Sequence, residues 1–196
     1  MKEKKNNAST RKLVLMGLMI GISIILASTP LGLIPTPIVS ATILHVPTII
    51  MALLEGPIAG MGVGLAVGLA TLVRALTSPT GVLDPLFINP FVSVFPRVLI
   101  GLSAYYGSVL GQKLFPKASF RETMGIIVGS ALGSLTNTVG VLGMLALIYG
   151  SRVKELTGTK AITLLFTVAG TNGVMEIIVA SILSVVIVKA LHKIFY

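Results

Sequence analysis

Apolar segments long enough to cross a membrane fill most of this 196-residue chain. Of its residues, 54% are hydrophobic and 11% are charged, whereas soluble domains carry about 25% charged residues. A chain with so little polar surface cannot cover its apolar side chains in water, so a bilayer has to be its solvent. Its length suits one domain of membrane helices and leaves little room for a soluble module.

Six apolar segments, separated by proline, glycine and charged residues, predict an all-α integral membrane protein with a six-helix bundle. They cover residues 13–28, 43–54, 58–76, 89–114, 123–149 and 161–191. The second would reach only about 18 Å at a rise of 1.5 Å per residue, so it must lie deep in the bundle or gain length from the loop before it. We expect one membrane domain over residues 13–196, preceded by a basic cytoplasmic leader over residues 1–12.

The first segment and the loop after it admit more than one interpretation. The leader and first segment also fit a signal peptide with Leu26-Ala27-Ser28 as its cleavage site, but the further spans favour an uncleaved helix. The loop TPLGLIPTPIVSAT, residues 29–42, holds three prolines and no charged residue. Proline disfavours helix, and an apolar loop needs something to pack against. We therefore predict that this proline-rich loop is a lid over the bundle.

Lysine and arginine residues predict which ends of the helices face the cytoplasm. With the amino terminus inside, the cytoplasmic segments hold Lys2, Lys4, Lys5, Arg11, Lys12, Lys113, Lys117, Arg121, Lys189 and Lys193. The outer segments then hold Arg74, Arg152, Lys154 and Lys160. The positive-inside rule favours this orientation, with both termini in the cytoplasm. The net charge of +9 is thereby explained as membrane anchoring, and we expect no nucleic acid partner.

Glycine recurs at every fourth position in three of the segments. The series are Gly17 and Gly21 in the first segment, Gly56, Gly60, Gly64 and Gly68 before and in the third, and Gly125, Gly129 and Gly133 in the fifth. This spacing lets membrane helices approach closely, so the longer series are expected to pack the bundle. The alternative is a smooth face that docks a partner helix, for which Gly17 and Gly21 are the best candidates.

An ionisable residue, Arg97, lies inside the fourth segment, directly after Pro96. Counted from Asn89 at the outer end, Arg97 lies about 12 Å deep at 1.5 Å per residue. Ionisable residues at such depths face a polar cavity or a partner and by default indicate function. Because Pro96 has no backbone N–H, it leaves a carbonyl one turn earlier free to serve the same cavity.

Other polar residues are predicted to gather in the same outer half of the bundle. Asn172 and Glu176 lie four residues apart on the sixth segment, so they share a helix face. The candidate substrate-binding residues are Arg97, Glu176, Asn172, Asn137, His45, Arg74 and Asn89. This set fits a small ligand that offers a carboxylate to an arginine and hydroxyl or amide groups to the other side chains.

Each of these residues also has a purely structural interpretation. Arg97 and Glu176 can neutralise one another in the interior, asparagines can join helices by hydrogen bonds, and His45 can be a core histidine. One buried pair would be enough for structure, whereas this set is larger. The larger set favours a ligand site.

Missing motifs exclude several classes of protein. The chain has no GxxxxGK[ST] phosphate loop and no HExxH or GxSxG motif. Its six acidic residues are few for a carboxylate protease or a metal-dependent lipid enzyme, so we expect no catalytic residues, metal or cofactor. No inverted repeat is apparent, which disfavours a self-contained secondary carrier. That carrier and a membrane scaffold stay as the alternatives to a binding subunit driven by partner proteins.

Four stretches of the sequence resemble one family. They are the basic leader with its Gly17/Gly21 helix, TPLGLIPTP, ATILHVPTIIMALLEGPIAGMGVGLAVGLATLVRA and INPFVSVFPRVLIG. Over nearly its whole length the chain resembles the S components of energy-coupling factor (ECF) vitamin transporters. The second and fourth stretches look most similar to the pantothenate-specific members.

The resemblance implies six helices in the cell membrane and an outward-facing vitamin site roofed by the first loop. It also implies that small residues on the first helix, here Gly17 and Gly21 where many members carry alanine, face a transmembrane coupling subunit. Two ATPase subunits would supply the energy, and the S component would topple in the membrane during transport.

The substrate implied by the resemblance can be compared with the polar residues. Pantothenate offers a carboxylate, an amide and two hydroxyls, which match Arg97 or Arg74 together with the asparagines and Glu176. Riboflavin, folate and hydroxymethylpyrimidine are the alternatives. The absence of tryptophan and an aromatic content of 6% disfavour a site that stacks riboflavin or a pterin.

Overall fold

The computed structural model describes residues 2–34, 41–79, 81–116 and 120–195, and almost all of them are helical. The helices are α1 (Lys2–Ser28), α2 (Val46–Glu55), α3 (Pro57–Thr77), α4 (Pro90–Ser93), α5 (Phe95–Leu114), α6 (Arg121–Thr157), α7 (Ala161–Val168) and α8 (Val174–Phe195). Shorter elements are the 3-10 turns η1 (Pro30–Gly32) and η2 (Asp84–Ile88), the π-helical turn η3 (Ala169–Gly173), and the strands β1 (Leu33–Ile34) and β2 (Ala41–Thr42). The predicted helical class therefore holds, with one short β pairing that the sequence did not predict.

Five of the helical segments in the described residues are long and apolar enough to cross a membrane. They are Thr10–Ser28, Pro57–Thr77, Pro90–Leu114, Arg121–Thr157 and Ala161–Phe195. The predicted second span corresponds to α2, which is apolar but has only 10 residues. All residues of α2 from Val46 to Ala52 are buried. The chain is thus a multi-pass membrane protein in which α2 is a short helix in the core.

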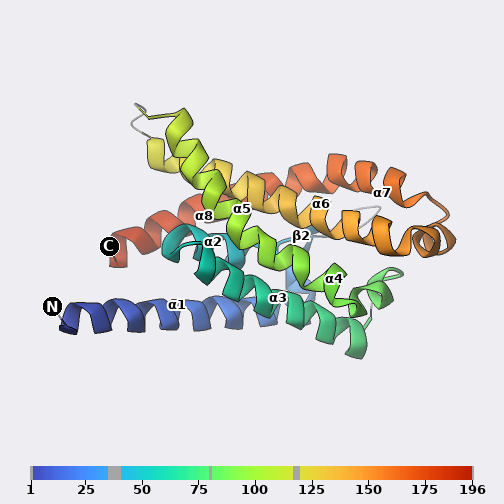
Figure 1. Ribbon diagram of the computed structural model, residues 1–196, viewed down its shortest axis with the longest axis horizontal. Coiled ribbons are helices and arrows are strands. Elements are labelled where there is room, and N and C mark those ends of the chain that lie inside the picture. Colours follow the sequence, from blue (N-terminus) through green and yellow to red (C-terminus); the bar gives the residue numbers. More distant parts are fainter. Residues whose placement is uncertain (1, 35–40, 80, 117–119, 196) are drawn as a thin grey trace.

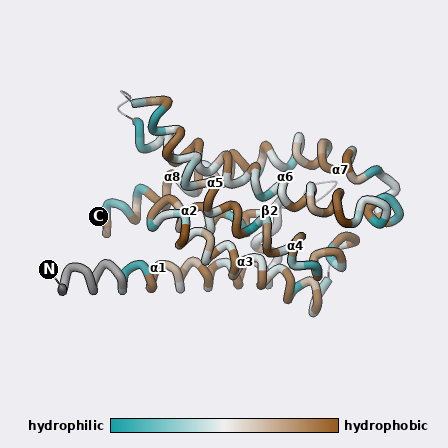
Figure 2. Tube along the Cα trace, in the orientation of Figure 1, coloured by the Kyte–Doolittle hydropathy of each residue, from teal (hydrophilic) through white to brown (hydrophobic). Residues whose placement is uncertain are grey.

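The long helices run along the long axis of the molecule, as Figure 1 shows. Both termini lie at one end, together with the last turn of α5 and the first turn of α6, and the last turn of α3 and the connection from α6 to α7 lie at the other end. Hydrophobic residues dominate the helices, and hydrophilic ones gather near several of their ends (Figure 2). The two termini share an end, as predicted. The assignment of that end to the cytoplasm, and of residues 1–12 to a leader, stays a prediction.

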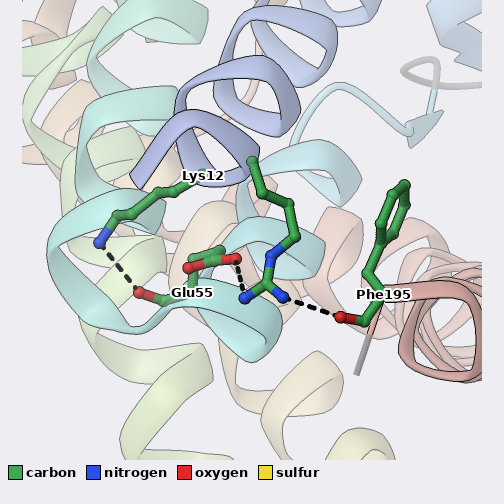
Figure 3. A network of polar contacts seen from close by, with 4 residues as sticks. Lys12, Glu55 and Phe195 are labelled. Carbon is green, nitrogen blue, oxygen red and sulfur yellow. Dashed lines mark hydrogen bonds and ion pairs between the residues drawn. The ribbon is translucent and has the colours of Figure 1, made fainter. Parts of the chain in front are cut away.

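A polar network joins three helices at the end that holds the termini (Figure 3). Arg11 of α1 donates from Nη1 to the backbone carbonyl of Phe195 at 2.8 Å, and its Nη2 lies 3.4 Å from Oε1 of Glu55. The neighbouring Lys12 donates from Nζ to the backbone carbonyl of Glu55 at 3.4 Å. The network therefore ties the start of the first span to the ends of α2 and α8.

The glycine series of α3 packs directly against α5 and the residue before it. A Cβ atom on Gly68 would lie 2.6 Å from the Cα atom of Val94, and one on Gly64 would collide with the backbone carbonyl of Arg97. Real Cβ atoms do not approach so closely, so these glycines are what allows the two backbones to touch. The predicted packing role is confirmed for Gly60, Gly64 and Gly68, whereas in the described structure a Cβ atom on Gly56, the residue before α3, would meet nothing within 4 Å.

Gly125, Gly129 and Gly133 of α6 have the same role, whereas Gly17 and Gly21 of α1 do not. A Cβ atom on Gly129 of α6 would lie 2.6 Å from the backbone oxygen of Ala104 in α5. By contrast, among the described residues no heavy atom lies within 4 Å of a Cβ atom built on Gly17 or Gly21. The bundle itself therefore does not require glycine at either position of α1.

This contrast predicts different effects of glycine-to-alanine substitutions on stability. Gly68→Ala should destabilise the protein by about 1–3 kcal/mol, because overpacking a tight contact forces the backbones apart. Gly143→Ala in α6 is the matched control, since in the described structure a Cβ atom there meets nothing within 4 Å. Thermal unfolding in detergent, followed by circular dichroism, measures both. Equal melting temperatures would contradict the close contact between α3 and α5.

Candidate functional site

The buried cation of the site is Arg97, which lies in the first turn of α5 and is 7% exposed. The predicted fourth span breaks at Val94, between α4 and α5, and Pro96 lies in the first turn of α5, where a missing N–H is tolerated. Pro96 leaves the carbonyl of Val92, four residues earlier, without its helical donor. Arg97 donates from Nη1 to this carbonyl at 3.1 Å. The carbonyl expected from the sequence is therefore present, and it holds the guanidinium inside the bundle.

A second contact to Arg97 comes from an aromatic ring. The Cζ atom of Arg97 lies 5.6 Å from the ring centroid of Phe87 in η2, within the range of a cation–π interaction. Sequence reasoning missed Phe87, because it lies between the predicted spans 58–76 and 89–114 and no periodic signal there would point its ring inward. The turn-forming pair Asp84-Pro85 lies just before Phe87 and favoured a loop at this position.

Glu176 joins three elements of the structure. It lies in the first turn of α8 and is 6% exposed. Its Oε1 accepts the backbone N–H of Thr42 in β2 at 2.8 Å, and its Oε2 accepts the hydroxyl of Thr138 in α6 at 2.8 Å. The sequence predicted that Glu176 contacts a ligand. In the structure both of its oxygens already accept hydrogen bonds from the protein, which makes it an anchor of the first loop.

The described parts of the predicted lid form a small β pairing. Leu33 pairs with Thr42 and Ile34 with Ala41 in antiparallel register. Residues 35–40, the middle of the predicted lid, lie outside the described residues. The end of this pairing is attached to the helices through the hydrogen bond from Thr42 to Glu176.

Asn172 lies in the π-helical turn η3, between α7 and α8. It is 4% exposed, and its Oδ1 accepts a hydrogen bond from the hydroxyl of Thr171 at 3.3 Å. Such π-helical turns are frequent at functional sites, since they turn side chains away from the regular helical positions. Sequence reasoning treated residues 161–191 as one regular helix and missed this turn. Gly170 and Gly173, which weaken a regular helix, flank Asn172 and were the available signal.

Glycine contacts define how α2 lies against α6. A Cβ atom on Gly129 would lie 3.0 Å from the side chain of Leu53, and one on Gly133 would lie 2.8 Å from the side chain of Ile49. Residue numbers increase from Gly129 to Gly133 along α6, while those of the contacted residues decrease from Leu53 to Ile49 along α2. The two helices are therefore antiparallel at this contact. A further step of four residues leads from Ile49 to His45, the residue before α2, and from Gly133 to Asn137.

His45 and Asn137 are both buried, at 1% and 6% exposure. Both ring nitrogens of His45 lack a hydrogen-bond partner within the part of the chain that the structure describes. Buried polar atoms are normally hydrogen-bonded, so an imidazole without a protein partner is suited to a polar ligand. Among the described residues no group satisfies this ring, which favours the ligand interpretation of His45 over that of a core histidine.

Five of the seven predicted site residues are buried, namely Arg97, His45, Asn137, Asn172 and Glu176. Electrostatic interactions link Arg97 to both His45 and Glu176. Glu176 in turn contacts Thr138, the neighbour of Asn137, and lies four residues after Asn172. No ion pair of 4.0 Å or less joins Arg97 to Glu176 in the described residues. A simple neutralising pair therefore does not account for the two buried charges.

The other two predicted residues lie at helix ends and have other contacts. Nη2 of Arg74 lies 3.7 Å from Oδ2 of Asp84. Asn89 caps α4, since its Oδ1 accepts the N–H of Phe91 at 3.0 Å, and its Nδ2 donates to the hydroxyl of Tyr149 at 3.2 Å. These contacts are with Asp84, Phe91 and Tyr149, none of which belongs to the buried cluster, here defined as Arg97, His45, Asn137, Asn172 and Glu176.

Comparison with known proteins identifies the family of the chain. The chain matches the family model of the ECF transporter, substrate-specific component, over residues 11–188. It is 33% identical over 168 residues to the pantothenic acid transporter PanT of Lactococcus lactis subsp. cremoris, with 79% of each chain covered. It is 32% identical over 186 residues to the pantothenate transporter PanT of Leuconostoc mesenteroides subsp. mesenteroides, covering 91% of this chain and 90% of that relative. The chain therefore belongs to the substrate-specific components of energy-coupling factor transporters, a family of transport proteins and not of enzymes.

Proposed function

We propose that this chain is the pantothenate-binding subunit of an ATP-driven ECF importer in the cell membrane. The observation that carries the proposal is the buried cluster, which places an arginine, a histidine, a glutamate and two amides inside a mainly apolar bundle. Such groups are expensive to bury in a membrane protein and mark ligand sites by default. Two relatives that align with most of the chain are named as pantothenate transporters, which favours this vitamin over the alternatives.

The chemistry of the cluster suits the groups of pantothenate. Arg97 carries five N–H donors, and Val92 engages one nitrogen, so the guanidinium has the capacity to bind a carboxylate as well. Asn137 and Asn172 can each donate and accept, as an amide and hydroxyls of the ligand require. His45 supplies two further ring nitrogens. In this proposal Glu176 holds the first loop and contacts the vitamin only secondarily.

The energy for uptake would come from partner subunits. We propose that a transmembrane coupling subunit docks on α1 at Gly17 and Gly21 and connects the chain to two ATPases. The open face at both glycines supports this assignment, since small residues let a second helix approach closely. Both termini would then lie in the cytoplasm, in agreement with the lysine and arginine distribution.

Replacing the arginine of the cluster should weaken vitamin binding. Arg97→Gln is expected to raise the Kd for pantothenate by about 10- to 100-fold, because it removes a hydrogen-bonded charge opposite a carboxylate. Titration calorimetry of the purified chain measures the effect. Arg152→Gln is the matched control, since Arg152 is exposed and pairs with Glu155 three residues away.

The same titration tests which arginine meets the vitamin and whether the vitamin is the right one. Loss of binding in Arg74→Gln with full binding in Arg97→Gln would contradict the site proposed here. Tight binding of riboflavin, folate or hydroxymethylpyrimidine in place of pantothenate would agree with the proposed site but contradict the proposed substrate. Uptake by the isolated chain in liposomes, driven by an ion gradient alone, would reject the dependence on ATPases.

Removal of the Glu176 carboxylate should release the first loop. In Glu176→Ala the backbone N–H of Thr42 loses its acceptor, and amide exchange over residues 41–46 is expected to rise at least about tenfold, as expected for the loss of one hydrogen bond to a charged group. Exchange in the contact between α3 and α5 should stay unchanged. Hydrogen–deuterium exchange with mass spectrometry measures both. Equal protection of residues 41–46 in the variant and the native chain would show that Glu176 does not anchor the loop.

Bulky residues on the open face of α1 should separate docking from vitamin binding. Gly17→Leu is expected to reduce co-purification with the coupling subunit at least about tenfold, because a large side chain blocks close helix approach. Pantothenate binding by the isolated chain should be retained. Gly143→Leu is the control, since that position is equally open within the described structure but lies on α6. Normal co-purification of the Gly17 variant would place the docking face elsewhere.

A further inference from the structure

A groove of about 730 Å³ lies between α1 and α3, apart from the buried cluster. The helices touch near Gly62, where a Cβ atom would lie 3.1 Å from Cε of Met16. Further along, the facing residues are small, and Ala27, Ala66 and Ala70 leave space between the helices. The volume falls in the range of about 300–1,000 Å³ that is typical of ligand pockets.

The groove has the depth of one leaflet of a bilayer. Its lining on α3 runs from Ala66 to Ser78, which is about 18 Å at 1.5 Å per residue, and half of a hydrocarbon core of about 30 Å is about 15 Å. Leu69 and Val73 on its wall are 49% and 55% exposed, so the groove opens sideways from two membrane-spanning helices. The leaflet that it faces is the one opposite the chain termini (Figure 1).

The end of the groove at the membrane surface is polar and carries a cation. Arg74 lines this end together with Ser28 and Ser78. Arg74 forms an ion pair with Asp84, with 3.7 Å between Nη2 and Oδ2, and an arginine with five N–H donors can bind a phosphate in addition to such a partner. An arginine near a helix end places its charge at the level of the lipid headgroups, and its planar fork matches the oxygens of a phosphate.

We propose that this groove binds one phospholipid of that leaflet, with an acyl chain along Ala66, Leu69, Ala70 and Val73 and its phosphate against Arg74. A partner helix is the less suitable occupant, because it would bring apolar side chains to the cationic end of the groove. The face that suits a helix, at Gly17 and Gly21, is not part of the groove lining. The lipid site is independent of the vitamin site, so either can fail alone.

Native mass spectrometry of the purified chain, incubated with palmitoyl-oleoyl phosphatidylglycerol and then washed in detergent, tests the proposal. The native chain should retain one lipid. Ala70→Phe fills the groove and should retain at least about tenfold less. Leu65→Phe is the matched control and should retain lipid normally, since Leu65 lies on the same helix, is 46% exposed and does not line the groove.

A second variant acts at the polar end and leaves the groove open. Arg74→Gln should weaken retention about tenfold, as expected for the loss of one charged hydrogen bond, whereas Arg152→Gln should not. Each variant is compared only if it elutes as a single, monodisperse peak in size-exclusion chromatography, so a variant that does not fold is recognised. If one variant does not fold, the other variant and its control decide. Pantothenate titration of Ala70→Phe shows separately whether the vitamin site is intact.

Three results would overturn the lipid site. The first is a native chain that retains no phospholipid, and the second is equal retention by Ala70→Phe and Leu65→Phe. The third uses the absence of cysteine from the sequence, which makes the cysteine of Leu69→Cys unique. A cross-link from this position to the coupling subunit of an assembled transporter, with no lipid on the isolated chain, would assign the groove to a protein contact.

Discussion

The hydrogen bond from Arg97 to the carbonyl of Val92 is the interaction on which the site depends. A guanidinium in a membrane bundle has to be matched by polar groups nearby, and Pro96 provides one by leaving a helical carbonyl without its donor. The same proline separates α4 from α5, which brings Arg97 into the bundle from a helix start. Gly64 then permits α3 to lie directly on the backbone of Arg97. The buried charge, the break between α4 and α5 and the close packing of α3 on α5 thus all depend on a few neighbouring residues.

Glu176 is the counterpart of Arg97 on the other side of the buried cluster. It lies directly after a π-helical turn and connects α8 to α6 and to the first loop. A displacement of any of these three elements would therefore change the hydrogen bonds of one carboxylate. This arrangement links the position of the loop to the helices that carry Asn137 and Asn172. The loop and the site are mechanically coupled without a direct ion pair between the two buried charges.

Local sequence patterns predicted those features that depend on local chemistry. Hydropathy gave the spans, four-residue spacing gave the glycine contacts, and Pro96 gave the free carbonyl. The hydrogen bond between Thr42 and Glu176 joins residues 134 positions apart, so no local pattern contains it. The two-residue strands are too short for an alternating pattern, and the π-helical turn breaks the regular period that predicted one helix. Arg74 was grouped with the site because the depth of a residue in the membrane can be counted along a helix. The direction of its side chain, toward Asp84, cannot be predicted in this way.

The network around Arg11 has a mechanical consequence for α1. In the middle of the bundle this helix touches α3 near Gly62, and at its start Arg11 and Lys12 attach it to Glu55 and Phe195. A lateral force on α1 would pass through these attachments to the turn between α2 and α3 and to the last turn of α8. The first helix would then move together with the rest of the bundle, and the whole protein would tilt as a rigid body under that force.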